Sequence, residues 1–158
     1  MSDVTAAVRR TAAPRWSLVS ALVLCVVGLG ISIYLAIEHA TAGTSLACPA
    51  TGRIDCVKVT TSSYSEIFGI PVAYLGVAYF VVATALAFLA LSSTAGSLAL
   101  ARVVVAVAGI LFVLYLVWAE LFRIHAICLW CTGVHVVTFL VFAVTVLGEA
   151  LRDPDAVD

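Results

Sequence analysis

The chain has 158 residues, of which 64% are hydrophobic and 11% are charged, and its formal net charge is −1. A soluble domain carries about 45–50% apolar and about 25% charged residues, so this composition predicts an integral membrane protein. The eight basic residues form no patch, which argues against nucleic-acid binding. The length is enough for one compact bundle in the lipid bilayer and for no appended soluble domain.

The first apolar run follows a polar segment, residues 1–16, that contains three arginines. It extends over about residues 17–37, close to the roughly 20 residues that a helix needs to cross about 30 Å of hydrocarbon. It is too long for the core of a signal peptide, and no small-x-small cleavage site directly follows it. We therefore expect an uncleaved first transmembrane helix.

A polar connector, residues 38–68, follows the first span and contains Cys48 and Cys56. Such a long connection between helices is typical of functional or disordered segments. Its sequence Ser63-Tyr64-Ser65-Glu66 fits a capping box. We therefore expect a short helix near residues 63–68 that rests on the membrane surface.

Three further apolar runs complete a set of four predicted spans, at about residues 70–91, 100–122 and 127–147. Pro71 suits the first turn of the second span, and short polar turns separate the later ones. The expected fold is an all-α membrane protein, a four-transmembrane-helix bundle of residues 17–148 with a long extracytoplasmic loop. Polar segments 1–16 and 149–158 flank it.

The distribution of basic residues predicts the orientation in the membrane. Four spans place both termini on one side, together with five arginines, and three basic residues fall on the other side. The positive-inside rule therefore predicts cytoplasmic termini in the cell's inner (plasma) membrane. The cysteines of the connector and Cys128 then face the outside, where disulfides persist. The two sets are Arg9, Arg10, Arg15, Arg102 and Arg152, against Arg53, Lys58 and Arg123.

The sequence Cys128-Leu129-Trp130-Cys131 opens the fourth apolar run, which contains no charged residue as far as residue 147. Residues three apart share a helix face, so Cys128 is predicted at the membrane surface and Cys131 one turn deeper. The positive end of the helix dipole favours a thiolate at such a position. The outer cysteine is thus placed for thiol exchange, and the inner one for a molecule dissolved in lipid.

Three roles compete for the loop pair and the Cys-x-x-Cys pair. As structural staples they would mainly restrict the unfolded chain, which a bundle held by the bilayer hardly needs. A four-cysteine metal site would require Cys131 as a ligand inside the bilayer. A redox relay passes electrons between two pairs through mixed disulfides, with a quinone as the lipid-soluble carrier, and we prefer this role. Cys25 lies in mid-span and is assigned to core packing.

The order of these motifs resembles the vitamin K epoxide reductase family in its bacterial, single-domain form. The resemblance covers about residues 16–147. The matching pieces are Asp55-Cys56, Ser62, Ile67-Phe68-Gly69-Ile70-Pro71-Val72, Leu75-Gly76 and Cys128-Leu129-Trp130-Cys131.

This resemblance implies a four-helix bundle around a quinone, closed by the loop. It implies that Cys128 and Cys131 form the active site and that Cys131 exchanges electrons with menaquinone or ubiquinone, without a metal. Cys48 and Cys56 would shuttle electrons to a thioredoxin-like protein, and Ser62 would line the active site. Some members carry a fused thioredoxin-like domain, so a separate, DsbA-like extracytoplasmic partner is expected here.

His135 stands where the vertebrate enzymes of this family place a quinone-contacting Tyr. It lies one turn below Cys131, and a hydrogen bond to a quinone carbonyl and an interhelical bond are equally supported. The departure leaves epoxide reduction open. Other polar and aromatic residues are assigned to the membrane interfaces and aromatic belts, namely Glu38, His39, Glu120, Arg123, His125, Tyr34, Tyr74, Tyr79, Tyr115 and Trp118.

The predicted function is a membrane thiol oxidoreductase that generates disulfides by oxidising the thioredoxin-like partner and reducing a membrane quinone. One alternative is the DsbB type of quinone-linked thiol oxidase, which carries its Cys-x-x-Cys in the first outer loop. The other is a non-enzymatic scaffold or transport protein with structural disulfides.

Overall fold

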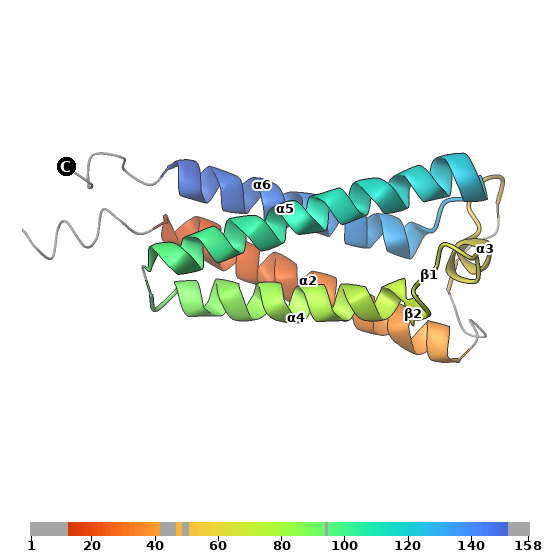
Figure 1. The fold of residues 1–158 in the computed structure, drawn as a ribbon, viewed down its shortest axis with the longest axis horizontal. Helices are drawn as coiled ribbons and strands as arrows, with labels where there is room; N and C mark the ends of the chain where they lie inside the picture. The colour runs from red at the N-terminus through yellow and green to blue at the C-terminus, as the bar shows by residue number, and fades with distance from the viewer. Residues whose placement is uncertain (1–12, 42–46, 49–50, 94, 152–158) are drawn as a thin grey trace, which may run out of the picture.

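Four long helices run along the long axis of the computed structural model, which describes residues 13–41, 47–48, 51–93 and 95–151 (Figure 1). Each is long and apolar enough to cross a membrane, because a helix bonds its own backbone polar groups internally and can turn apolar side chains toward lipid. The predicted four-helix membrane bundle is therefore confirmed. The helices are α2 (Arg15–Ala40), α4 (Val72–Ala90), α5 (Gly96–Trp118) and α6 (Leu129–Ala150).

Small residues let the helices approach closely, as is usual in membrane bundles. Helix α2 packs against α4 and α6, and α5 packs against α4 and α6. A side chain at Gly28 of α2 would collide with the ring of Phe80 from α4. Cys25 belongs to the core cluster around that ring and is 1% exposed, which confirms its assignment to packing.

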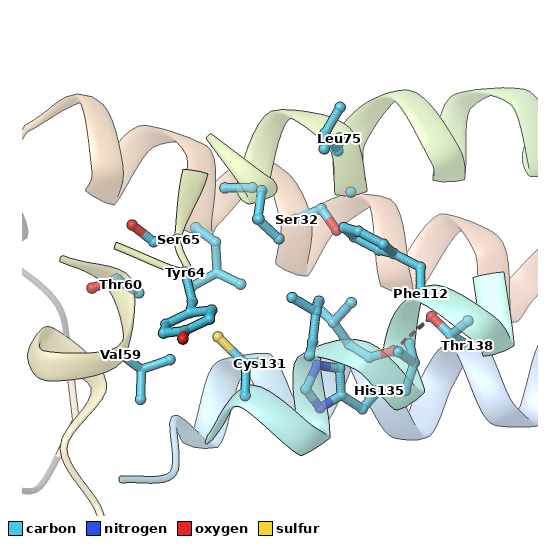
Figure 2. A pocket seen from close by; sticks show the side chains of 18 of the residues that line it. Ser32, Val59, Thr60, Tyr64, Ser65, Leu75, Phe112, Cys131, His135 and Thr138 are labelled. Carbon is cyan, nitrogen blue, oxygen red and sulfur yellow. Dashed lines mark hydrogen bonds between the residues drawn. The ribbon is translucent and has the colours of Figure 1, made fainter. Parts of the chain in front are cut away.

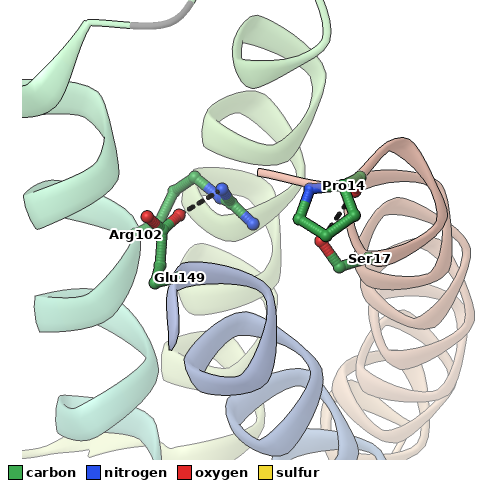
Figure 3. Close-up of polar contacts among 4 residues, drawn as sticks. All are labelled: Pro14, Ser17, Arg102 and Glu149. Carbon is green, nitrogen blue, oxygen red and sulfur yellow. Dashed lines mark hydrogen bonds and ion pairs between the residues drawn. The ribbon is translucent and has the colours of Figure 1, made fainter. Parts of the chain in front are cut away.

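A buried ion pair joins α5 to α6 at one end of the bundle (Figure 3). The Nη1 atom of Arg102 lies 2.9 Å from Oε1 of Glu149. Helix α6 includes Glu149, which lies two residues beyond the predicted span. At the same end the Ser17 hydroxyl donates to the Pro14 carbonyl near the start of α2. The described part of the connector and the start of α6 lie at the opposite end (Figure 1).

The prediction of a helix near residues 63–68 is wrong. This segment forms an antiparallel hairpin, with β1 (Glu66–Ile67) paired to β2 (Ile70–Pro71). The intervening Phe68 and Gly69 both have positive φ, 53° and 77°, which is the conformation of a two-residue hairpin loop. The backbone N–H and hydroxyl of Ser65 both donate to the Ser62 carbonyl, which closes a turn just before β1.

The short helix of the connector is instead α3 (Cys56–Thr60). Asp55 provides its N-cap, because its carboxylate accepts a hydrogen bond of 2.9 Å from the backbone N–H of Lys58. The backbone of the preceding residues bonds to Ile127, just before the fourth helix. Asp55 N–H donates to the Ile127 carbonyl at 3.1 Å, and Ile127 N–H donates to the Arg53 carbonyl at 2.8 Å. The connector is thus fastened beside the Cys-x-x-Cys sequence.

Candidate active site

The Cys-x-x-Cys pair occupies the start of α6, as predicted. Cys128 is the N-cap residue, and its sulfur accepts a hydrogen bond of 3.3 Å from the backbone N–H of Cys131. Cys128 precedes the membrane-spanning helix by one residue. A hydrogen bond with the Cys131 thiol lowers the pKa of the Cys128 thiol, aided by the backbone N–H groups of residues 130 and 131 and opposed by burial. Cys128 is therefore the thiol of this pair that is prepared for exchange.

The loop pair, Cys48 and Cys56, is joined by a disulfide with its Cα atoms 6.1 Å apart. Cys56 is 1% exposed and shares a buried cluster with Cys128, which is 0% exposed. Cys48 is partly exposed. The fold therefore brings the two predicted pairs together, with Cys56 on the side of Cys128.

The residue before Cys48 is held by two aromatic side chains. The indole Nε1 of Trp130 donates to the Ala47 carbonyl at 3.0 Å, and the Ala47 N–H donates to the Tyr34 hydroxyl at 3.1 Å. The two rings lie 4.6 Å apart between centroids. Trp130, in the middle of the Cys-x-x-Cys sequence, thus anchors the loop that carries the other cysteine pair. Tyr34 also holds this loop, although it was expected in an aromatic belt.

A largely apolar cavity of about 300 Å³ lies between the connector and the helices (Figure 2). Three predicted site residues line it, namely Ser62, Cys131 and His135, whereas Cys128 and the loop disulfide do not. Ser62 donates its hydroxyl hydrogen to the Val59 carbonyl at 2.8 Å, so its oxygen is positioned by the end of α3. His135 is 8% exposed. Other lining residues include Ser32, Leu35, Val72, Leu75, Phe80, Phe112, Val113 and Thr138.

Four lining residues had been assigned elsewhere from the sequence, namely His39, Tyr64, Tyr79 and Glu120. Glu120 was expected at the interface but is only 6% exposed. It lies in η1 (Ala119–Ile124), a π-helix that continues α5. A π turn shifts the helical phase, so α-helical periodicity gives no signal for this placement. Glu38, also expected at the interface, is 5% exposed.

Arg123 lies just after the third predicted span and contacts Tyr64, which lines the cavity. Its Nε atom donates to the Tyr64 hydroxyl at 2.6 Å, and its guanidinium carbon lies 5.8 Å from the Tyr64 ring centroid and 5.9 Å from that of Trp118. Tyr64 lies beside Cys131 in the cavity (Figure 2). Arg123 was expected to be solvated or paired, and its partners in the structure are Tyr64 and Trp118.

Comparison with known proteins agrees with this geometry. The model of the vitamin K epoxide reductase family matches residues 19–146, which include both cysteine pairs and all the residues that line the cavity. A search of curated proteins finds no match. In the part of the chain that the structure describes, no group of three or more His, Cys, Asp or Glu side chains is placed to hold a metal ion. The chain belongs to the vitamin K epoxide reductase family, whose general role is quinone-linked thiol–disulfide redox chemistry in a membrane.

Proposed function

We propose that this protein generates disulfides by oxidising an extracytoplasmic thioredoxin-like, DsbA-like protein and reducing a membrane quinone. The observation that carries the proposal is the position of the Cys-x-x-Cys pair between two environments. Cys128 shares a buried cluster with Cys56 of the loop disulfide, while Cys131 lines the apolar cavity. Electrons can therefore enter from the loop and leave into a space that suits a lipid-soluble molecule.

In the proposed route, a thiolate of the partner attacks Cys48, the more exposed loop cysteine, and breaks the Cys48–Cys56 bond. The partner's second thiol then attacks its own sulfur bound to Cys48, which leaves the partner oxidised and the loop pair reduced. Cys56 next attacks Cys128 of the Cys128–Cys131 disulfide and releases Cys131. Cys48 finally attacks Cys56, which restores the loop disulfide and releases Cys128. The shared buried cluster of Cys56 and Cys128 supports this route.

The cavity has the properties that a quinone ring requires. Its volume of about 300 Å³ falls in the usual range of ligand pockets, and such pockets combine apolar walls with a few polar groups. Tyr64, Glu120 and His135 line the cavity and would offer polar groups to a carbonyl-bearing ring bound there. Menaquinone and ubiquinone are the proposed acceptors, and the ring is the part that reaches Cys131.

The two alternatives differ in where the active pair lies and whether electrons move. A DsbB-type oxidase would carry its Cys-x-x-Cys in the first outer loop, whereas this pair opens the fourth helix. A scaffold or transport protein would not need a free thiol facing an apolar cavity. Purified protein mixed anaerobically with a reduced thioredoxin-like donor should reduce one equivalent of quinone for each donor dithiol oxidised. Donor oxidation without loss of quinone absorbance, or neither change, would reject the proposal.

Replacing His135 with Phe is expected to slow quinone reduction about tenfold, because a neutral hydrogen bond contributes roughly 0.5–1.5 kcal/mol net. Exchange between the loop pair and Cys128 should be unchanged, since His135 lies one turn deeper. Stopped-flow measurement of quinone absorbance checks the first effect, and donor thiol titration without quinone checks the second. Unchanged quinone kinetics would leave His135 with an interhelical role.

The proposed orientation places residues 38–68 and 123–127 outside and residues 92–99 inside. In a cysteine-free background, Lys58→Cys should be labelled in whole cells by a membrane-impermeant maleimide, whereas Ala95→Cys should react only after the cells are permeabilised. Both positions are exposed in the structure, so accessibility to the reagent depends on the side of the membrane. Labelling of residue 95 in intact cells would reverse the orientation.

A further inference from the structure

Glu120 is an ionisable residue buried in a membrane bundle, a class of residue that is expensive to keep and usually functional. The π-helix η1 turns Ala119 and Glu120 inward, with 1% and 6% exposure, while the next three residues are exposed. Single π turns in helices frequently mark functional sites. The backbone therefore adopts an uncommon geometry where the carboxyl group enters the cavity.

Glu120 lies close in the fold to the start of the Cys-x-x-Cys sequence. Glu120 accepts a hydrogen bond of 3.2 Å at its backbone carbonyl from the N–H of Ala126, two residues before Cys128. It lines the same cavity as Cys131 and His135. No other Asp or Glu of the described residues lines this cavity.

The reaction requires a group that handles protons at this place. Two thiols lose two protons and two electrons as the Cys128–Cys131 disulfide forms, and a quinone takes up two of each to become a quinol. Two negative charges facing one apolar cavity repel each other. A proton lost by Cys131 is therefore favoured to reside on Glu120, within reach of a molecule in the cavity.

We propose that Glu120 is the proton carrier between the cysteine pair and the quinone, an inference that rests on the proposed function. As a carboxylate it takes the proton of a thiol, and as a carboxylic acid it gives that proton to a quinone oxygen. It carries the two thiol protons in turn and returns to the carboxylate. The sum is two thiols plus a quinone giving a disulfide plus a quinol, with no proton gained or lost.

Other titratable groups near Glu120 come from each element that packs around the cavity. They also affect how the rate of quinone reduction depends on pH. They are His39 from α2, Tyr64 from the connector, Tyr79 from α4, and Cys128, Cys131 and His135 from α6. The test therefore compares variants at Glu120 itself. Glu120→Gln keeps the shape and removes the titration, Glu120→Asp keeps the acid, and Glu66→Gln is a control at a half-exposed carboxylate in the hairpin.

The first measurement is a single turnover of fully reduced protein with quinone over a range of pH. Glu120→Gln should reduce quinone at least about 100-fold more slowly, the scale of general acid–base catalysis, and should lose a titration step that the wild type shows. Glu120→Asp should recover at least a tenth of the wild-type rate. The control Glu66→Gln should keep the full wild-type rate. Exchange from the loop pair, measured without quinone, should change less than threefold in every variant.

The second measurement uses reduced, quinone-free protein and follows alkylation of Cys131 by N-ethylmaleimide. In Glu120→Gln the inflection should move to lower pH, because a neutral amide no longer opposes the thiolate charge. A purely structural role would not produce this shift together with slower quinone reduction. A wild-type quinone rate in Glu120→Gln, or equal loss of exchange and quinone reduction in both Glu120 variants, overturns the assignment. Absence of quinone reduction in the wild type instead overturns the proposed function.

Discussion

Cys131→Ala is expected to reduce quinone reduction to the uncatalysed background, a loss on the order of 10⁴-fold or more, as when an enzyme loses its nucleophile. Cys131 is the cysteine that lines the cavity, so its removal leaves no sulfur able to pass electrons into it. The measurement is quinone absorbance under anaerobic conditions with a reduced thioredoxin-like donor.

Cys25→Ala is the matched control, because Cys25 is also a free cysteine in the bundle. It belongs to the core cluster around Phe80 and does not line the cavity that holds Cys131. The substitution should retain most of the quinone reduction and cost stability on the scale of an ordinary core change, roughly 1 kcal/mol. An equal loss of activity in both variants would contradict the division into relay and packing cysteines.

Cys48→Ala is expected to trap a covalent bond between Cys56 and Cys128. The two sulfurs belong to one buried cluster, and Asp55 is fastened to Ile127 through the backbone. In oxidised protein the free Cys56 attacks the Cys128–Cys131 disulfide. No second thiol then remains in the loop to resolve the mixed disulfide. The mixed disulfide between Cys56 and Cys128 should therefore accumulate in the oxidised protein.

A protease site in the polar segment at residues 92–97, between the second and third spans, makes the trapped bond visible. After cleavage, the two fragments of Cys48→Ala should stay joined on a non-reducing gel and separate on reduction. The double variant Cys48→Ala with Cys128→Ala should give separate fragments in both gels. Free fragments from Cys48→Ala and joined fragments from Cys56→Ala would show that the two loop cysteines have the opposite roles.

The helices were predictable because each is apolar over the length of a membrane span, and the start of the fourth was predictable from the Cys-x-x-Cys sequence. The hairpin was not. A capping-box pattern is short, and its residues Ser63 and Glu66 also fit a turn followed by a strand. The backbone conformation was decided at Phe68 and Gly69, and positive φ at a Phe has no sequence signal.

The site was predictable where it depends on local sequence, as for Cys128, Cys131 and His135 along one helix. It was not predictable where distant elements meet. His39 comes from α2 and Tyr64 from the connector, and both reach the cavity through tertiary packing. Glu120 was missed because polar residues near a membrane surface are usually solvated, and only the π turn directs it inward.

Both cysteine pairs, the cavity and Glu120 lie together at one end of the bundle, and this has a bioenergetic consequence. Moving one elementary charge across a membrane against 100 mV costs about 2.3 kcal/mol. In the proposed reaction, electrons and protons leave the thiols together and enter the quinone at the same membrane face. No net charge crosses the bilayer, so disulfide formation neither consumes nor generates membrane potential. Its energy comes from the difference in reduction potential between the thiols and the quinone pool.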